Sequence, residues 1–313
     1  MTTLYYSHPD FLKHNTGVGH PECADRLRFI ERAVTQAQPA GLVRIQPVVG
    51  ADIAAKLGLI HTPAMLEQVF NSFPQTGQAY LDADTVISPG SKAAALLAVS
   101  AVCDVVDKVC SGEANNAFCA VRPPGHHAEP SRSMGFCVFN NIAIAAEYAR
   151  TQRQLDRVAI VDFDVHHGNG TQAAFVQQPN IMYVSSHQWP HYPGSGQSSE
   201  TGLGNIVNLP LAAGTTGDLL RRLYSQQVFP ALRRFNPQLL LISAGFDGHR
   251  LDPLADLRLE TDDYVWLTQQ LMAVAADCCQ GRIVSVLEGG YHLQALADCV
   301  TAHVSQLCLV AQS

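Results

Sequence analysis

The sequence predicts an α/β fold in which one mostly parallel β-sheet is covered by helices on both faces. Short apolar segments recur along the chain without polar alternation, which is typical of parallel strands buried on both faces. Longer amphipathic segments lie between them, and this alternation of strand and helix favours one layered sheet over two separate domains. We therefore expect a single domain that spans residues 1–313.

The predicted strands are short, apolar and often rich in β-branched residues. They cover residues 3–7, 117–121, 157–163, 181–186, 206–211, 239–244 and 282–288. The predicted helices cover residues 91–110, 140–152, 216–235 and 261–279. The first of these helices follows Pro89 and Gly90, and the last two open with Thr and Asp, which indicates their N-caps.

The composition excludes several classes of protein. The chain has a formal net charge of −7 and a pI near 6.0, so it lacks the basic surface that nucleic-acid or anionic-membrane binding requires. The N-terminal "MTTLYYSHPD" does not resemble a signal peptide, and no run of about 20 apolar residues is present. Nine cysteines occur without a C-x-x-C pair, which is typical of reduced thiols in a cytoplasmic protein.

Unusual polar residues follow four of the predicted strands. "RPPGHH" follows strand 117–121, "DVHHGN" follows 157–163, "GFDGH" follows 239–244 and "GGYH" follows 282–288. Ligands of open parallel sheets bind outside the carboxyl ends of the strands. The four segments therefore predict one shared site.

The segment "VDFDVHHGNG" (161–170) predicts a metal ion at this site. In an extended segment Asp162, Asp164 and His166 share one face, and burying unpaired charges there would be costly. A divalent metal ion would compensate for their burial. Asp247 could supply a third ligand beside Asp164 and His166, and three protein ligands with an open position describe a catalytic zinc site.

Two further motifs could supply proton transfer and oxyanion stabilisation. His126 and His127 follow a rigid Pro-Pro-Gly turn, and a histidine can take the proton of a water whose pKa a metal ion lowers to about 7. Tyr291 follows two glycines, and its phenol could donate to a carbonyl oxygen that becomes an oxyanion. Taken alone, the histidines could form a chance pair in a surface loop, and the tyrosine could merely cap a turn. Together the motifs predict metal-assisted amide hydrolysis.

The segments "RPPGHHAEPSRSMGFCVFNNIAIAA", "VDFDVHHGNGTQ", "SAGFDGHRLDPL" and "LEGGY" resemble the zinc-dependent histone deacetylase family. The resemblance is nearest to the class II and bacterial amidohydrolase members and runs from "HPECADRL", near residue 20, to beyond Tyr291. It implies the arginase/deacetylase fold, with a parallel sheet of about eight strands.

The resemblance also implies a role for each residue of the site. The implied zinc ligands are Asp164, His166 and Asp247, and Tyr291 matches the catalytic tyrosine. His127 resembles the general base and acid, with His126 as its electrostatic partner and Asp162 as the carboxylate that orients His126. Asn169 stands where class I relatives carry Asp, and this loss of a carboxylate should make His127 less basic.

The same comparison implies cation sites and a substrate channel. Residues that match a buried potassium site are Asp162, Asp164, His166, Ser185 and Ser186, and a second potassium ion is expected near Phe175. Gly135, Phe136 and Tyr192 resemble the channel walls, although both aromatics could be plain core residues. Leu254 aligns with the channel rim, and Arg26 resembles an arginine linked to product exit, although it could also be an exposed helix residue.

These observations lead to a cytoplasmic enzyme that deacetylates acetyl-lysine in proteins or peptides by water attack, with one catalytic zinc ion and one or two potassium ions. The first alternative is an acetylpolyamine amidohydrolase that acts on a small cationic amine. The second is a catalytically idle protein that binds acyl-lysine. A two-manganese ureohydrolase is disfavoured, because Gly168 stands where Asp-x-His-x-Asp would place the second carboxylate. We expect no nucleic-acid or membrane partner.

Overall fold

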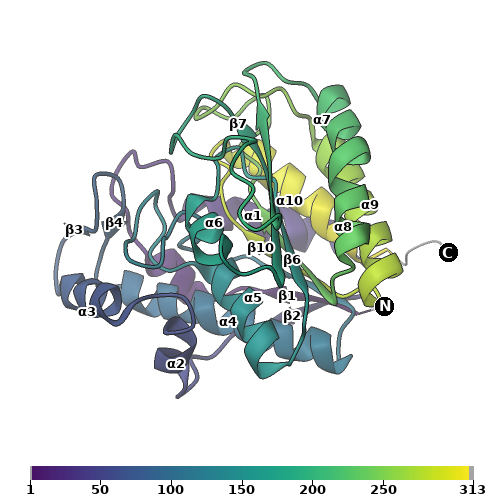
Figure 1. Cartoon of the computed structure of the whole chain (residues 1–313). Coiled ribbons are helices and arrows are strands. Elements are labelled where there is room, and N and C mark those ends of the chain that lie inside the picture. The colour runs from purple at the N-terminus through teal and green to yellow at the C-terminus, as the bar shows by residue number, and fades with distance from the viewer. Residues whose placement is uncertain (1, 310–313) are drawn as a thin grey trace.

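The computed structural model describes residues 2–309 and contains one central eight-stranded sheet (Figure 1). Every neighbouring pair of strands in this sheet is parallel. The strand order is β2-β1-β5-β10-β9-β6-β7-β8. The strands are β1 (Thr3–Tyr6), β2 (Leu42–Ile45), β5 (Asn116–Cys119), β6 (Val158–Asp162), β7 (Ile181–Gln188), β8 (Ile206–Leu211), β9 (Leu239–Ala244) and β10 (Ile283–Leu287).

Helices cover both faces of the sheet, with α9 and α10 on one side and α4 and α5 on the other (Figure 1). On the first side α10 (Leu293–Leu307) packs between α1 (Asp25–Ala37) and α9 (Thr261–Cys279). On the other side α4 (Ser91–Ser111) packs against α5 (Asn141–Gln152). The remaining elements are η1 (Pro9–Lys13), α2 (Ile53–Leu57), α3 (Pro63–Ser72), α6 (Asn169–Phe175), α7 (Gly217–Leu223), η2 (Tyr224–Val228), α8 (Phe229–Phe235) and the hairpin β3 (Ala79–Tyr80) with β4 (Val86–Ile87).

The predicted α/β fold and all seven predicted strands are confirmed, to within one or two residues at their ends. Strands β5, β6, β9 and β10 are buried along their whole length, which explains why their sequences lack polar alternation. Strand β2 was not predicted. It lies at the edge of the sheet with its central residues Val43 and Arg44 exposed, so it carries no apolar run.

The helix predicted over residues 216–235 is interrupted in the structure. A π-helical turn, η2, separates α7 from α8, which has a proline at its first turn. Pro230 lacks an N–H group for the regular ladder, and a wider turn accommodates this loss. The predicted N-cap of α9 is also wrong, because Glu260 rather than Thr261 caps this helix in a capping box with Asp263. Among residues 2–309, no helix combines the length and apolar content needed to cross a bilayer.

Candidate active site

The four polar segments predicted to share a site follow four adjacent strands. Strands β5, β10, β9 and β6 are neighbours in the middle of the sheet. Because all are parallel, their carboxyl ends meet at one edge. His127, Tyr291, Asp247 and His166 are therefore brought together from segments up to 164 residues apart.

Asp164, His166 and Asp247 form a buried cluster with the geometry of a metal site. Their potential ligand atoms all lie within 4.8 Å of one another. Nδ1 of His166 is 3.1 Å from Oδ1 of Asp164 and 3.1 Å from Oδ2 of Asp247. Tetrahedral ligands at about 2.0 Å from zinc would be about 3.3 Å apart. The nitrogen and two carboxylate oxygens therefore fit a zinc ion.

Backbone amides hold the two carboxylates in place. Gly289 donates to Oδ2 of Asp164 at 2.8 Å, and Val165 donates to Oδ1 of Asp247 at 2.9 Å. In each carboxylate the other oxygen faces Nδ1 of His166. Burial and the neighbouring charge of Asp164 raise the pKa of Asp247, so a cation at this cluster would relieve an unfavourable pair of buried charges.

The structure has no room for a second carboxylate after His166. A Cβ atom at Gly168 would collide with Oδ2 of Asp162 and with the hydroxyl of Tyr183. A residue that carries a metal-binding carboxylate cannot replace Gly168 without moving these groups. The packing thus supports the sequence argument against a two-metal ureohydrolase.

The hydrogen bonds of His127 determine which of its nitrogens carries a proton. Nδ1 lies 2.8 Å from Oδ1 of Asn169, whose Nδ2 donates to Oε1 of Glu129 at 2.7 Å. A carboxylate only accepts, so the amide of Asn169 is oriented with its oxygen toward His127. Nδ1 therefore donates, and Nε2 is free to accept a proton. Burial, with the charges of His126 and His166, keeps the pKa of His127 well below its usual range, which favours this neutral form.

His126 lies beside His127 in a different electrostatic environment. Its Nδ1 is 2.9 Å from Oδ2 of Asp162, which also accepts from the hydroxyl of Tyr183 at 2.9 Å. Burial alone would lower the pKa of His126, but the charges of Asp162 and Asp164 outweigh it and raise the pKa to about 10. The two rings, with centroids 4.0 Å apart, thus form a pair in which His126 is charged and His127 is neutral.

Tyr291 contributes a hydroxyl group that remains protonated at neutral pH, because burial and the charge of Asp247 raise its pKa well above the usual range. The backbone before this residue is held by Arg26, whose Nε donates to the carbonyl of Gly290 at 2.7 Å. A second anchor is Asp252, whose Oδ2 accepts from the amide of Tyr291 at 2.6 Å. The tyrosine is therefore fixed from both sides.

A cavity of about 90 Å³ joins these groups to the surface. Its walls include His127, Tyr291 and His166, a member of the cluster that could hold a metal ion. The residues predicted for the channel also line this cavity, and they are Gly135, Phe136, Tyr192 and Leu254. One acid without a predicted role, Asp84, lines it as well. The cavity therefore brings a neutral histidine, a phenol and one residue of the possible metal cluster together.

The sequence model of the histone deacetylase domain family matches residues 20–307 of this chain. The chain belongs to the histone deacetylase family. This membership identifies it as a hydrolytic deacetylase that cleaves an amide bond and implies a metal cofactor. The arrangement of sheet and helices is accordingly the arginase/deacetylase fold.

Similar proteins come from a plant and a bacterium. The chain is 37% identical to the chloroplastic histone deacetylase 14 of Arabidopsis thaliana, over 95% of this chain and 74% of the relative. It is 38% identical to the histone deacetylase-like amidohydrolase of Pseudomonas aeruginosa, over 79% of this chain and 66% of the relative. The crystal structure of the HDA15 HD domain superposes with a TM-score of 0.92 at 33% identity, covering 98% of this chain and 88% of that one.

The structure is inconsistent with one alternative for each of three residues of the deacetylase, and their roles stay predictions. Arg26 is fully buried, so the alternative of an exposed helix residue is wrong. Tyr192 is 38% exposed and Phe136 is partly exposed. Because both rings also line the cavity, neither is a plain core aromatic.

The cavity wall at residues 135 and 136 adopts an uncommon backbone conformation. Gly135 and Phe136 have φ angles of 58° and 66°, in the left-handed region. The amide of Gly135 donates to Oδ1 of Asp84, and the amide of Phe136 donates to the hydroxyl of Thr85, each at 3.1 Å. Thr85 in turn donates to Asp84 at 3.1 Å. The loop before β4 therefore fixes a wall that its own backbone preferences disfavour.

Two acids that were not predicted from the sequence hold the site of the deacetylase. Glu288 is fully buried and accepts from the amides of Gly125 and His126 at 2.7 and 3.2 Å. Asp252 accepts from the amide of Tyr291, as described above. A signal for Glu288 is present in "LEGGY", because an acid directly after a buried apolar strand needs partners. Asp252 lies in a loop and gives no such signal.

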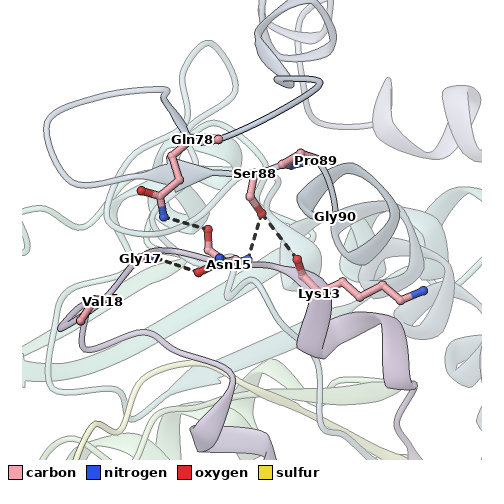
Figure 2. A pocket seen from close by; sticks show the side chains of 9 residues that line it. Lys13, Asn15, Gly17, Val18, Gln78, Ser88, Pro89 and Gly90 are labelled. Atoms are coloured by element: carbon pink, nitrogen blue, oxygen red, sulfur yellow. Dashed lines mark hydrogen bonds between the residues drawn. The ribbon is translucent and has the colours of Figure 1, made fainter.

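A larger surface groove lies away from these residues (Figure 2). It has a volume of about 770 Å³ and includes Lys13, Asn15, Gln78 and Ser88 in its lining. The residues drawn in Figure 2 form hydrogen bonds mainly with one another and with the backbone. Lys13 is the only ionisable side chain in this lining, so the groove lacks the groups that hydrolysis requires.

Proposed function

We propose that this deacetylase hydrolyses acetyl-lysine in proteins or peptides, with Asp164, His166 and Asp247 holding one zinc ion. The observation that carries the proposal is the small cavity shared by His127, His166 and Tyr291. When bound, a zinc ion would polarise the amide carbonyl and lower the pKa of water to about 7. The other steps depend on side chains of this chain.

His127 acts as general base and then as general acid. Its Nε2 is unprotonated because Nδ1 donates to Asn169, so Nε2 takes the proton of the attacking water. The charged His126 disfavours a second positive charge beside it, and this repulsion promotes release of the proton to the leaving amine. Asp162 keeps His126 charged and oriented.

Tyr291 stabilises the negative charge that develops on the carbonyl oxygen. Its hydroxyl is protonated and the residue lines the cavity, so the hydroxyl would donate a hydrogen bond that strengthens as the oxyanion forms. Arg26 and Asp252 position it through the backbone. Because the donor is held in place before the reaction, little reorganisation is required.

Leu254 and the aromatics Phe136 and Tyr192 favour a lysine side chain as substrate. They line the cavity with apolar surface that suits the methylene stem of lysine. A specific observation favours acetylpolyamines as the second candidate, because Asp84 also lines the cavity and its carboxylate could attract a distant ammonium group. Asp84 already accepts from Gly135 and Thr85, and for this reason we rank the lysine substrate first.

The first test compares substrates and asks whether hydrolysis depends on a metal ion. A fluorogenic acetyl-lysine peptide should be hydrolysed, and a chelator should stop the reaction. Acetyl-lysine peptides should exceed N-acetylated spermidine and putrescine in kcat/KM. If the acetylpolyamines are cleaved at least as efficiently as every peptide tried, the polyamine function takes the place of the one proposed.

Substitution of Leu254 by Glu should shift the specificity toward polyamines. The new carboxylate would attract the distant ammonium of the polyamine, and an exposed ion pair of this kind is worth about 0 to 1 kcal/mol. The ratio of kcat/KM values, polyamine to peptide, should therefore rise severalfold. Leu254→Gln, which has a similar size and no charge, is the matched control. An equal shift in both variants would show that charge at the rim does not select the substrate.

Substitution of Thr85 by Val should widen or disorder the channel wall. Val keeps the shape of this buried residue but leaves the amide of Phe136 without its acceptor, and an unsatisfied buried group costs about 1–3 kcal/mol. KM for the peptide should rise severalfold with a smaller change in kcat. Thr268→Val is the control, because Thr268 is equally buried and hydrogen-bonded to Tyr264 and His303 away from the cavity. An unchanged KM in Thr85→Val would remove Thr85 from this role.

The proposal includes one buried potassium ion near Asp162 and a cytoplasmic location. The register of β6 and β7 pairs Asp162 with Ser185, and this pairing supports a site that oxygens of Asp164, His166 and Ser186 would complete. Such oxygens suit a hard cation. All nine cysteines are unpaired, and this supports a reducing compartment.

A further inference from the structure

The side chain of Asn205 lies among three backbone carbonyl groups. This asparagine precedes β8 and is only 4% exposed. Its Nδ2 is 2.9 Å from the carbonyl oxygen of Phe175, 3.1 Å from that of Gln178 and 2.8 Å from that of Ile181. This is the neighbourhood in which the family resemblance places a second potassium ion.

The surrounding contacts fix the orientation of the amide. Oδ1 of Asn205 accepts from the backbone amide of Leu203 at 3.0 Å. If the amide were flipped, its oxygen would face three carbonyl oxygens and its nitrogen would face an N–H donor. Every contact would then be repulsive, so the nitrogen must occupy the centre of the three carbonyls.

Three converging carbonyl oxygens are the kind of ligand set that replaces the hydration shell of a potassium ion. In this chain the two amide hydrogens of Asn205 already point into the set, and at least one of them is shared between two carbonyl oxygens. A cation at the same point would have to displace the side chain from a buried position, where Gly202 also packs against it. The residues present therefore do not fit a second potassium ion.

We infer that the side-chain amide of Asn205 takes the place of a potassium ion near Phe175. The end of α6 and the start of β7 are then held together by hydrogen bonds rather than by a cation. The three carbonyls belong to the last residue of α6, the turn after it and the first residue of β7. Helix α6 begins at Asn169, which orients His127. The amide thus anchors, independently of potassium, the element that carries a partner of the proposed base.

Thallium(I) provides a direct test with the wild-type protein, because it replaces potassium and scatters X-rays anomalously. Crystals grown with thallium in place of potassium should show no anomalous peak within bonding distance of the carbonyl oxygens of Phe175 and Ile181. A peak there would overturn the inference. This outcome is independent of whether thallium occupies the proposed site near Asp162, and it is independent of catalysis.

Substitution of Asn205 by Ala tests whether the carbonyls can accept a cation once the amide is gone. The variant should lose several degrees in Tm at low potassium and recover most of this loss as KCl replaces choline chloride at constant ionic strength. Asn208→Ala is the matched control. Asn208 lies in β8, three residues after Asn205, and is 7% exposed. Its Nδ2 also has three acceptors, but one of them is the side chain of Gln172 rather than a backbone carbonyl.

The control variant should lose stability without gaining a potassium response beyond that of the wild type. An equal response to potassium in both variants would contradict the inference, and so would the absence of any added response in Asn205→Ala. If Asn205→Ala does not fold, the thallium experiment on the wild type decides the question.

Discussion

Removal of the metal is expected to abolish deacetylation, and about one equivalent of zinc per chain is expected to restore it. The cluster of Asp164, His166 and Asp247 provides three ligands, and the crowded surroundings of Gly168 leave no space for a further carboxylate. Without a cation, the cavity retains His127 and Tyr291 but lacks the means to activate water at neutral pH. The measurement is peptide hydrolysis after chelation and dialysis, followed by titration with zinc.

The same titration should also reveal a change in stability. Two buried carboxylates face Nδ1 of one histidine, and a bound cation stabilises the folded state in proportion to its affinity, by about 4 kcal/mol when the free metal exceeds its Kd by 1,000-fold. Tm should therefore rise with zinc and saturate at the stoichiometry that restores activity. Asp247→Ala is the control, because it removes one ligand and should lose both responses. Two tightly bound transition metals per chain, both required for activity, would contradict a single-zinc site.

The sequence predicts those strands of the deacetylase whose residue types reveal that both faces are buried. The apolar runs of β6, β9 and β10 are visible because both faces of these strands are buried. Edge strand β2 has no such signal, since its two central residues face solvent. Helix α10 is amphipathic, yet it was not predicted, because it begins directly after the polar motif "GGYH" and has no strand after it to mark its end.

The chemistry of the site could be predicted for residues directly after the strands, because parallel strands bring such residues to one edge. The residues that hold these site residues in place could not be predicted. Asp252 accepts from a backbone amide 39 residues away, and Glu288 accepts from one 163 residues away. Backbone amides are the same at every position of a sequence, so nothing in the chain indicates which of them an acid will meet. Asn205 is a similar case, since its three acceptors are all carbonyls.

Substitution of Tyr291 by Phe should leave the fold and the metal content unchanged and lower kcat by about 10² to 10³, which corresponds to about 2.7–4 kcal/mol of lost transition-state stabilisation. The ring would still pack against Phe136 and lie near the guanidinium of Arg26, so only the hydroxyl is lost. Because the donor acts mainly on the oxyanion, KM for the acetyl-lysine peptide should change much less than kcat.

The matched control for this prediction is Tyr264→Phe, which removes another buried hydroxyl close to the site. Tyr264 is fully buried and packs against Phe246, with ring centroids 5.1 Å apart, but it does not line the cavity. Its hydroxyl has no hydrogen-bond partner among the described residues, so its loss should leave kcat and zinc content near the wild-type values. If Tyr291→Phe also retained near wild-type kcat, the oxyanion would have another donor, and the role of Tyr291 would be limited to packing beside Arg26. A large loss in Tyr291→Phe alone, at full zinc occupancy, would assign the hydrogen bond to this one hydroxyl.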